Sequence, residues 1–186
     1  MKKSDKTRAT IVTAARLLFS RNGFDQTTVR DIAAEAGIDP ALIVRYFGGK
    51  EALFIQAADI ALELPDVSSI DRLDIGLSLA KHFLKMWEDG GSHGGLPVLL
   101  RSAASNEGAA ERLREIFARQ VVPVLRPILP EDCALERAAM ISTQLLGVAL
   151  CRHILKLPPL VAIPADRLAV LVGAAIQNLI IDTPRD

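Results

Sequence analysis

The chain has 186 residues, half of them hydrophobic, and its equal numbers of basic and acidic side chains leave no net charge. This composition predicts a globular protein and excludes an intrinsically disordered one, which would be poor in apolar residues and highly charged. The charge is unevenly distributed, because residues 1–50 hold nine basic and five acidic residues and carry a charge of +4. The neutral total therefore conceals a basic N-terminal segment.

The cysteines and the apolar stretches indicate the compartment. Cys133 and Cys151 follow no disulfide or metal spacing, which favours core thiols and a reducing cytoplasm. Polar residues interrupt the apolar positions near the N-terminus at helical spacing, so no signal peptide and no export are expected. The most apolar stretches, 138–150 and 168–181, are too short or too polar to cross a bilayer, which needs about 20 apolar residues, and no membrane insertion is expected.

Three short helices are predicted near the N-terminus. Apolar positions at helical spacing predict a first helix that ends at the Asn-Gly pair 22–23. Thr27 or Thr28 can cap the start of a second helix, and Asp31, three residues after Thr28, has the spacing of a capping box. Asp39 and Pro40 predict the N-cap and first residue of a third helix.

The rest of the chain also shows the 3.6-residue period of helices. A fourth, connecting helix is expected to run from 50 to 64 until Pro65 stops it. Further helices are predicted over residues 70–87, 96–105, 109–129, 132–157 and 165–181. A flexible loop is expected at 90–95, and Pro123 and Pro127 should bend or break the helix over 109–129.

No segment alternates apolar and polar residues as a strand would, so the fold class is all-α. We expect an N-terminal three-helix helix-turn-helix domain over 1–48, the connecting helix over 49–65, and a helical ligand-binding and dimerisation domain over 66–186. The last two helices are apolar on more than one face, which predicts a homodimer in which they form a four-helix interface.

The segment 28–47 has the layout of a DNA-binding helix-turn-helix, whose second helix enters the major groove of double-stranded operator DNA. Arg45 has the geometry to bind guanine through two hydrogen bonds, whereas Ala41 and Leu42 offer apolar contacts to thymine methyl groups. The predicted groove-facing residues are Pro40, Ala41, Leu42 and Arg45, and the predicted phosphate contacts are Thr27, Thr28, Arg30, Tyr46 and Lys50.

The run from Arg8 to Phe54, RATIVTAARLLFSRNGFDQTTVRDIAAEAGIDPALIVRYFGGKEALF, resembles the DNA-binding domain of the TetR family. The resemblance implies an all-helical homodimer, usually a repressor, that releases a palindromic operator when a small molecule enters the C-terminal domain. The chain departs from the family at Ala41 and Val44, where glycine and tyrosine are common, and at Gly49, where serine is frequent. The tyrosine phosphate contact is thus absent at Val44, and a side-chain cap at Gly49 is in doubt.

The effector is expected to be a largely apolar small molecule of unknown identity. Cavities for such ligands are mostly apolar with a few polar groups. The candidate lining residues, most of which could equally be core, are Phe83, Met86, Trp87, Phe117, Met140, Gln144 and Cys151. No cofactor is predicted. His82, His93 and His153 lack the paired spacing of a metal site and are expected at the surface.

Two other functions are compatible with this sequence. The same fold could act as an activator or respond to a protein partner. A helical enzyme is the second alternative, but no nucleophile, base and orienting group can be proposed together, and the pattern from Arg8 to Phe54 would be left unexplained. We therefore expect a regulator and no enzyme.

Overall fold

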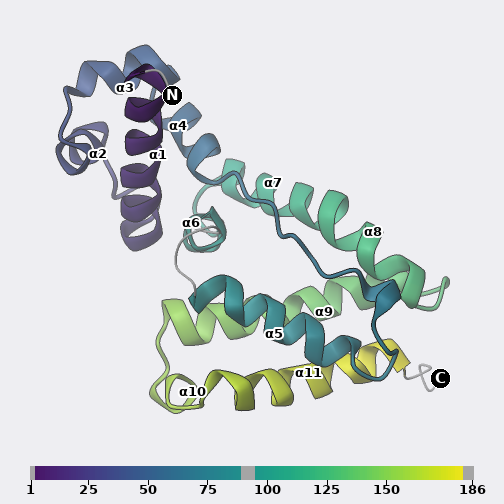
Figure 1. The fold of residues 1–186 in the computed structure, drawn as a ribbon. Coiled ribbons are helices and arrows are strands. Elements are labelled where there is room, and N and C mark those ends of the chain that lie inside the picture. The colour runs from purple at the N-terminus through teal and green to yellow at the C-terminus, as the bar shows by residue number, and fades with distance from the viewer. Residues whose placement is uncertain (1–2, 89–94, 182–186) are drawn as a thin grey trace. The chain divides into compact units, whose positions relative to one another are not determined.

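The computed structural model describes residues 3–88 and 95–181, and these residues form helices joined by turns and short extended segments, with no strand among them (Figure 1). They divide into two compact units: an N-terminal unit of residues 1–61 and 93–114, and a C-terminal unit of residues 62–92 and 115–186. The α-helices are α1 (Lys3–Asn22), α2 (Val29–Ala36), α3 (Pro40–Phe47), α4 (Lys50–Ala57), α5 (Ile75–Glu88), α6 (Gly95–Ser102), α7 (Glu107–Ile116), α8 (Val122–Leu125), α9 (Ala134–Ala149), α10 (Pro158–Val161) and α11 (Ala165–Ile181).

In the N-terminal unit, α1 packs against α2, α4 and α6. Its buried side chains, Ile11, Ala14, Ala15 and Phe19, recur at helical spacing, as expected. Phe19, Phe24 and Phe54 form an aromatic cluster with ring centroids 5.0 to 5.9 Å apart. Burial of these rings fixes the orientation of α1 and α4 around the α1–α2 turn.

The predicted end of α1 and the predicted starts of α2 and α3 are confirmed. Gly23 ends α1 with φ of 78°, in the left-handed region that other residues rarely adopt. The Thr28 hydroxyl accepts a hydrogen bond from the Asp31 amide (3.1 Å), and the Asp31 carboxylate accepts one from the Thr28 amide (2.9 Å), which completes the capping box of α2. Asp39 caps α3 by accepting from the Ala41 amide at 2.7 Å.

The predicted connecting helix over 50–64 is wrong beyond Ala57. Residues 59–66 are not helical, and Ile60 and Leu62 are buried on alternate positions of an extended segment. Arg16 of α1 donates to the carbonyl oxygen of Ala57, the last residue of α4, and to that of Asp59 just beyond it. Pro65 also disfavours helical backbone at the residue before it. The apolar positions 53, 57, 60 and 64 have the spacing of a helix. In the structure, however, only 53 and 57 lie in a helix, and 60 and 64 lie in the extended segment that follows it.

The C-terminal unit is built around α5, α9 and α11. Its core consists of buried aliphatic side chains, with the largest contributions from these three helices: Val67, Ile75, Leu79, Ala80, Leu84, Leu125, Leu129, Ala134, Ala138, Ile141, Leu168, Ala169, Ile176 and Ile180. Gly76 and Gly173 lie where α5 and α11 touch, and a Cβ atom added to Gly76 would lie 2.4 Å from the Gly173 carbonyl oxygen. The two backbones approach this closely only because neither residue has a side chain.

Polar side chains close the ends of these helices. Gln177 of α11 accepts from the Gly76 amide and donates to the Arg72 carbonyl group, both at 2.8 Å, and so caps the start of α5. The buried Arg137 donates to the Leu179 carbonyl oxygen (2.8 Å) at the end of α11. A positive charge at a helix C-terminus is stabilising because it opposes the helix dipole.

Several predicted boundaries shift. The helix expected from Ile70 begins at Ile75, because residues 71–74 form a turn and Leu73 is 69% exposed. Within 109–129, a π-helical turn over Phe117–Val121 separates α7 from α8, which contains Pro123. A second π turn, Leu150–Ile154, continues α9. The expected loop 90–95 lies outside the described residues except for Gly95, the first residue of α6.

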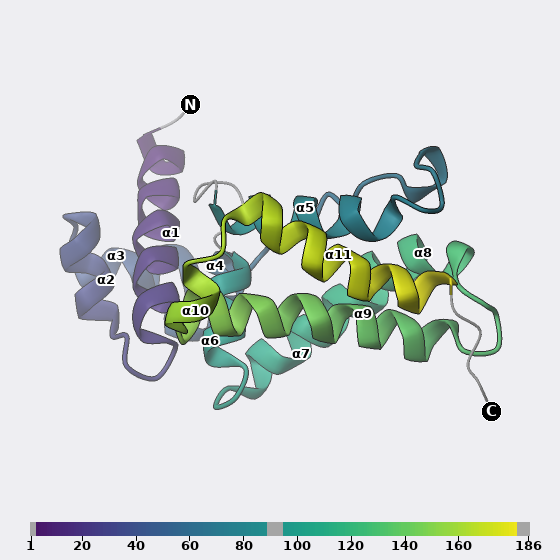
Figure 2. The ribbon, with the colours of Figure 1, turned by 90° about the horizontal axis from the view of Figure 1, so that it is seen from below.

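The outer faces of α9 and α11 remain apolar. The two helices lie side by side in the C-terminal unit (Figure 2). Their exposed large hydrophobic residues, which we call the α9–α11 face, are Leu135, Met140, Leu150, Val170, Leu171 and Ile181. The helix Ala134–Ile154 is also long and apolar enough to cross a membrane by length and composition alone, although only 28% of its 18-residue window is buried. Its buried residues contact the C-terminal core.

Candidate nucleic-acid interface

Helix α3 presents one apolar face to the protein and the other face to solvent. Ile43 and Phe47, one turn apart, are buried and anchor the helix to the N-terminal unit. Ala41, Val44 and Arg45 are exposed, and Val44 is 56% exposed. An anchored helix with exposed side chains along one face has the dimensions to enter the DNA major groove, which is about 12 Å wide.

The predicted groove-facing residues are therefore accessible, with Pro40 exposed and Leu42 half-buried. Val44 is a residue that the sequence reasoning discounted as the site of a missing tyrosine. Its exposure between Ala41 and Arg45 makes it a further apolar candidate, suited to a thymine methyl group. The signal that could have found it is the spacing of Ile43 and Phe47, which places 44 outside the buried face of the helix.

Thr27 is a correction to the predicted phosphate contacts. Its side chain is fully buried, and its hydroxyl donates to the Gly23 carbonyl group at 2.8 Å. It therefore shapes the α1–α2 turn from inside. Thr28 and Arg30 are exposed at the start of α2, where backbone N–H groups and the helix dipole favour an anion such as phosphate.

Tyr46 and Lys50 each make a contact within the N-terminal unit. The Arg8 guanidinium lies 5.2 Å from the centroid of the Tyr46 ring, and the Lys50 ammonium lies 4.1 Å from the centroid of Phe24. A cation over an aromatic face at an exposed site is worth about 0.5–1 kcal/mol, so Lys50 could exchange Phe24 for a phosphate at small cost. Gly49 provides no side-chain cap for α4, as its identity indicated.

Helix α6 is tied to the end of α1 and to the turn that precedes α2. Arg101 donates to the Ser20 carbonyl oxygen (2.7 Å), and Ser102 accepts from the Phe24 amide (3.2 Å). Ser105, just after α6, donates to the Asp25 carboxylate at 2.8 Å. These bonds make α6 part of the frame that holds the helix-turn-helix.

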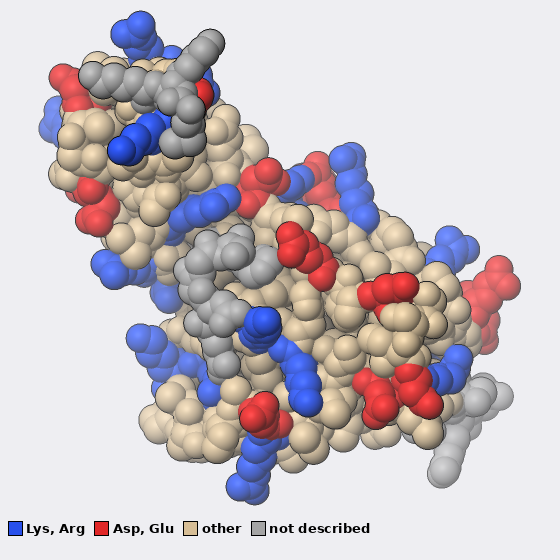
Figure 3. Space-filling model, in the orientation of Figure 1, with Lys and Arg blue, Asp and Glu red and all other residues tan. Residues whose placement is uncertain are grey.

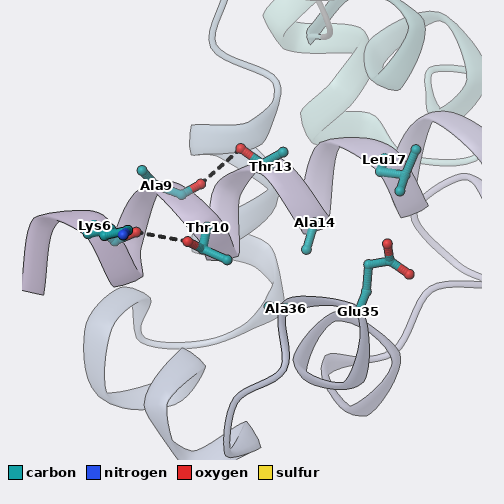
Figure 4. A pocket seen from close by; sticks show the side chains of 8 residues that line it. All are labelled: Lys6, Ala9, Thr10, Thr13, Ala14, Leu17, Glu35 and Ala36. Atoms are coloured by element: carbon teal, nitrogen blue, oxygen red, sulfur yellow. Dashed lines mark hydrogen bonds between the residues drawn. The ribbon is translucent and has the colours of Figure 1, made fainter.

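A shallow groove of about 360 Å³ lies between α1 and α2 (Figure 4). Small side chains of α1 line it, and the Thr10 and Thr13 hydroxyls are both bound to carbonyl groups of their own helix.

The face of the N-terminal unit seen in Figure 3 carries lysine and arginine side chains with acidic ones among them. This mixed but basic surface suits contact with phosphates more than deep binding of a small molecule.

The candidate effector residues all lie in the C-terminal unit, on α5, α9 and the two π turns. Phe83 and Met86 are buried, while Trp87, Phe117, Gln144 and Cys151 are half-buried. Phe117 packs against the aliphatic core. Met140 is a correction, because it is 44% exposed and belongs to the α9–α11 face.

The structure brings Trp87 onto His153, a residue that the sequence reasoning placed at the surface. Their rings stack with centroids 4.8 Å apart and an interplanar angle of 17°. Burial and the nearby Arg152 lower the pKa of His153 below its usual 6.5. His82 is half-buried too, with Nε2 2.8 Å from the Leu62 carbonyl oxygen, whereas His93 lies outside the described residues. Within residues 3–88 and 95–181, no three histidine, cysteine or acidic side chains gather to hold a metal.

Two parts of the chain match known protein families. Residues 11–57 match the family described as bacterial regulatory proteins, tetR family, and residues 74–180 match the tetracyclin repressor-like C-terminal domain. The chain belongs to the TetR family. It is therefore a DNA-binding transcriptional regulator with an N-terminal helix-turn-helix domain and a helical C-terminal domain, and members of this family are transcription factors and not enzymes.

Individual TetR-family relatives agree with this assignment. A TetR-family regulator from Streptomyces coelicolor A3 is 29% identical, with 98% of each chain covered and a TM-score of 0.63. A putative regulator from Pseudomonas aeruginosa PAO1, 21% identical over 95% of this chain and 90% of its own, has a TM-score of 0.68 and shares the fold.

Two curated relatives are similar over part of their length. The repressor NicS of Pseudomonas putida is 28% identical over 68% of this chain and 63% of its own, and the uncharacterised regulator YfiR of Bacillus subtilis is 34% identical over 32% and 29%. The match thus spans less than two thirds of either relative.

Proposed function

We propose that this TetR-family regulator is a repressor that binds an inverted-repeat operator as a homodimer and releases it when a largely apolar small molecule binds the C-terminal unit. The exposed face of α3, with Arg45 between apolar neighbours, carries the DNA-reading part of this proposal. The repressor NicS, similar over two thirds of this chain, supports the sign of regulation. A regulator that contacts DNA acts in the cytoplasm of a bacterium, which is the compartment we propose.

The α9–α11 face supports the homodimer. Leu171 is 53% exposed and Val170 is 56% exposed on a helix whose other side is fully buried. Large apolar side chains exposed on neighbouring helices indicate an interaction site, and a second copy of the same two helices supplies a matching surface. Two recognition helices in such a dimer would reach half-sites about one DNA turn, 34–36 Å, apart.

The dimer is tested by sedimentation of purified protein over a range of concentrations. Leu171→Glu places a charge in the proposed interface and should raise the dimer dissociation constant at least about tenfold, since burying an unpaired charge is costly. Leu73→Glu is the matched control, because Leu73 is 69% exposed but lies outside α9 and α11. Equal dimerisation of the two variants would refute the interface.

DNA reading is tested by salt-dependent titration against DNA from beside the gene, with random DNA as the reference. Arg45→Ala should reduce the preference for the specific site by about 1–3 kcal/mol, while Lys50→Ala should weaken binding to all sequences and lower the salt slope by about 1. Arg119→Ala, a change at an exposed arginine of the C-terminal unit, is the control. Equal loss on both DNAs for Arg45→Ala would exclude base reading by this residue.

Coupling between the effector and DNA requires that the two ligands favour different conformations. We propose α4 and α6 as transmitters. Arg16 joins α1 to the end of α4, and Arg101 joins α6 to the end of α1, so a shift of either helix would move the helix-turn-helix. Arg101→Ala should weaken the response of DNA binding to the effector, and an unchanged response would exclude this connection.

A further inference from the structure

Trp87 and His153 hold two buried nitrogen atoms without hydrogen-bond partners among the described residues. These atoms are Nε1 of Trp87 and Nε2 of His153. Buried polar atoms are nearly always paired, and an unpaired one costs about 1–3 kcal/mol. Two such atoms on rings whose centroids are 4.8 Å apart are therefore an exception that requires an explanation.

The position of the pair is suited to a ligand. Trp87 lies in the last turn of α5, and His153 lies in the π turn that continues α9. Turns of π-helix are frequently found at functional sites, because they interrupt the regular hydrogen bonding of the α-helix. Phe83, one turn before Trp87, has its ring centroid 6.3 Å from that of Trp87, and the neighbouring Met86 is also buried. Apolar groups therefore accompany the two nitrogen atoms.

The chemistry of the two nitrogens defines the group they would bind. The indole N–H of Trp87 can only donate a hydrogen bond, and Nε2 of a neutral histidine donates in one of its two tautomers. A neutral oxygen atom can accept a hydrogen bond from either donor. The guanidinium of Arg152 is committed elsewhere through bonds from Nη1 to the Leu160 and Ile163 carbonyl groups, at 2.7 and 2.8 Å. A buried anion without a paired cation would be costly, so a neutral acceptor fits better.

We propose that Trp87 and His153 form the polar end of the effector site and bind the carbonyl oxygen, or a comparable neutral oxygen acceptor, of an otherwise apolar molecule. This inference rests on the proposed function, because it names the chemical class of the effector. Trp87 is among the lining residues predicted from the sequence, and His153 is not. Their contact joins residues 66 positions apart in the chain.

The probes are four eight-carbon compounds of matched size: 2-octanone, octane, octanoate and octylamine. Binding is followed by the emission of Trp87, which is the only tryptophan of the chain, and by the shift in thermal unfolding temperature. We expect 2-octanone to bind at least about tenfold more tightly than each of the other three, as one or two hydrogen bonds would provide. Equal binding of octane, or no binding of 2-octanone, would overturn the proposal.

Two variants keep the ring stack and remove the polar atom. Trp87→Phe and His153→Phe should each lower the affinity for 2-octanone about five- to tenfold and abolish its advantage over octane, as read from thermal shifts. Without a probe, His153→Phe should unfold at the same temperature as the wild type or higher, because an unpaired polar atom is lost. A clear fall would show that Nε2 has a structural partner and would refute the proposal. Leu73→Met, at an exposed position outside α9 and α11, should change neither property.

All of these measurements are made without DNA, and release from the operator is measured separately. Sequence-specific DNA binding without any preference for 2-octanone would refute this inference and leave the proposed repressor standing. A preference for 2-octanone in a protein that does not distinguish its operator from random DNA would support the binding site and refute the proposed repressor.

Discussion

The crossing of α5 and α11 provides a stringent test of how the C-terminal unit is held together. In Gly76→Ala, the new Cβ atom would lie 2.4 Å from the Gly173 carbonyl oxygen and 2.8 Å from the backbone nitrogen of Gln177. Ordinary contact begins at 3.4 Å, so the two helices must separate by roughly 1 Å. A gap of that size forfeits about a quarter to a half of the dispersion energy of each affected contact.

The expected loss of stability is about 2 kcal/mol. Overpacking of a well-packed core costs about 1–3 kcal/mol or more, and the hydrogen bond from the Gly76 amide to Gln177 is weakened as well. Alanine recovers up to about 1 kcal/mol because it favours helical backbone more than glycine does. For a chain of this length, the unfolding temperature should fall by about 4–8 °C.

The assay is urea unfolding followed by circular dichroism at several protein concentrations, because subunit association would add to the measured stability. Gly147→Ala is the matched control, since Gly147 lies in α9 and a Cβ atom there would meet nothing within 4 Å. It should gain about 0.5–1 kcal/mol from helix propensity. Gly147 is exposed, so any effect on the dimer would depend on concentration. If Gly76→Ala were as stable as the wild type while the control behaved as expected, the close crossing would be refuted.

Three further predictions concern caps and titration. Thr28→Ala should destabilise the protein by about 1 kcal/mol through loss of the α2 cap, as measured by thermal unfolding, with Thr143→Ala as an exposed control. Hydrogen bonds from Thr28 lower the pKa of Asp31 below its usual 3.8. The ionised carboxylate therefore stabilises the fold fully above pH 3.8, and this contribution is lost as the pH falls through the lower pKa of the folded state. Asp31→Asn should reduce the fall in the free energy of unfolding over this acidic range. The lowered pKa of His153 means that only the unfolded chain takes up this proton just below pH 6.5, so stability should fall there, and His153→Phe should remove that part of the slope.

Much of the N-terminal unit could be predicted from local sequence. The Thr28–Asp31 box, the Asp39 cap before Pro40 and the turn at Gly23 depend on backbone groups within a few residues, so their spacing in the sequence is sufficient. The same is true of the exposed Arg45 on α3. Thr27 was misassigned because its hydroxyl is used inside the turn, which its sequence neighbours do not reveal.

The sequence by itself determined the helical fold class, the helix-turn-helix and the family, because short-range periodicity and capping chemistry carry that information. Only the tertiary structure decided where α4 ends, since Arg16 of α1 binds the carbonyl group of its last residue, Ala57. It also decided that Gly76 and Gly173 meet and that His153 stacks on Trp87. These contacts join residues far apart in the chain, and their energies depend on the packing of whole helices, which a local pattern does not encode.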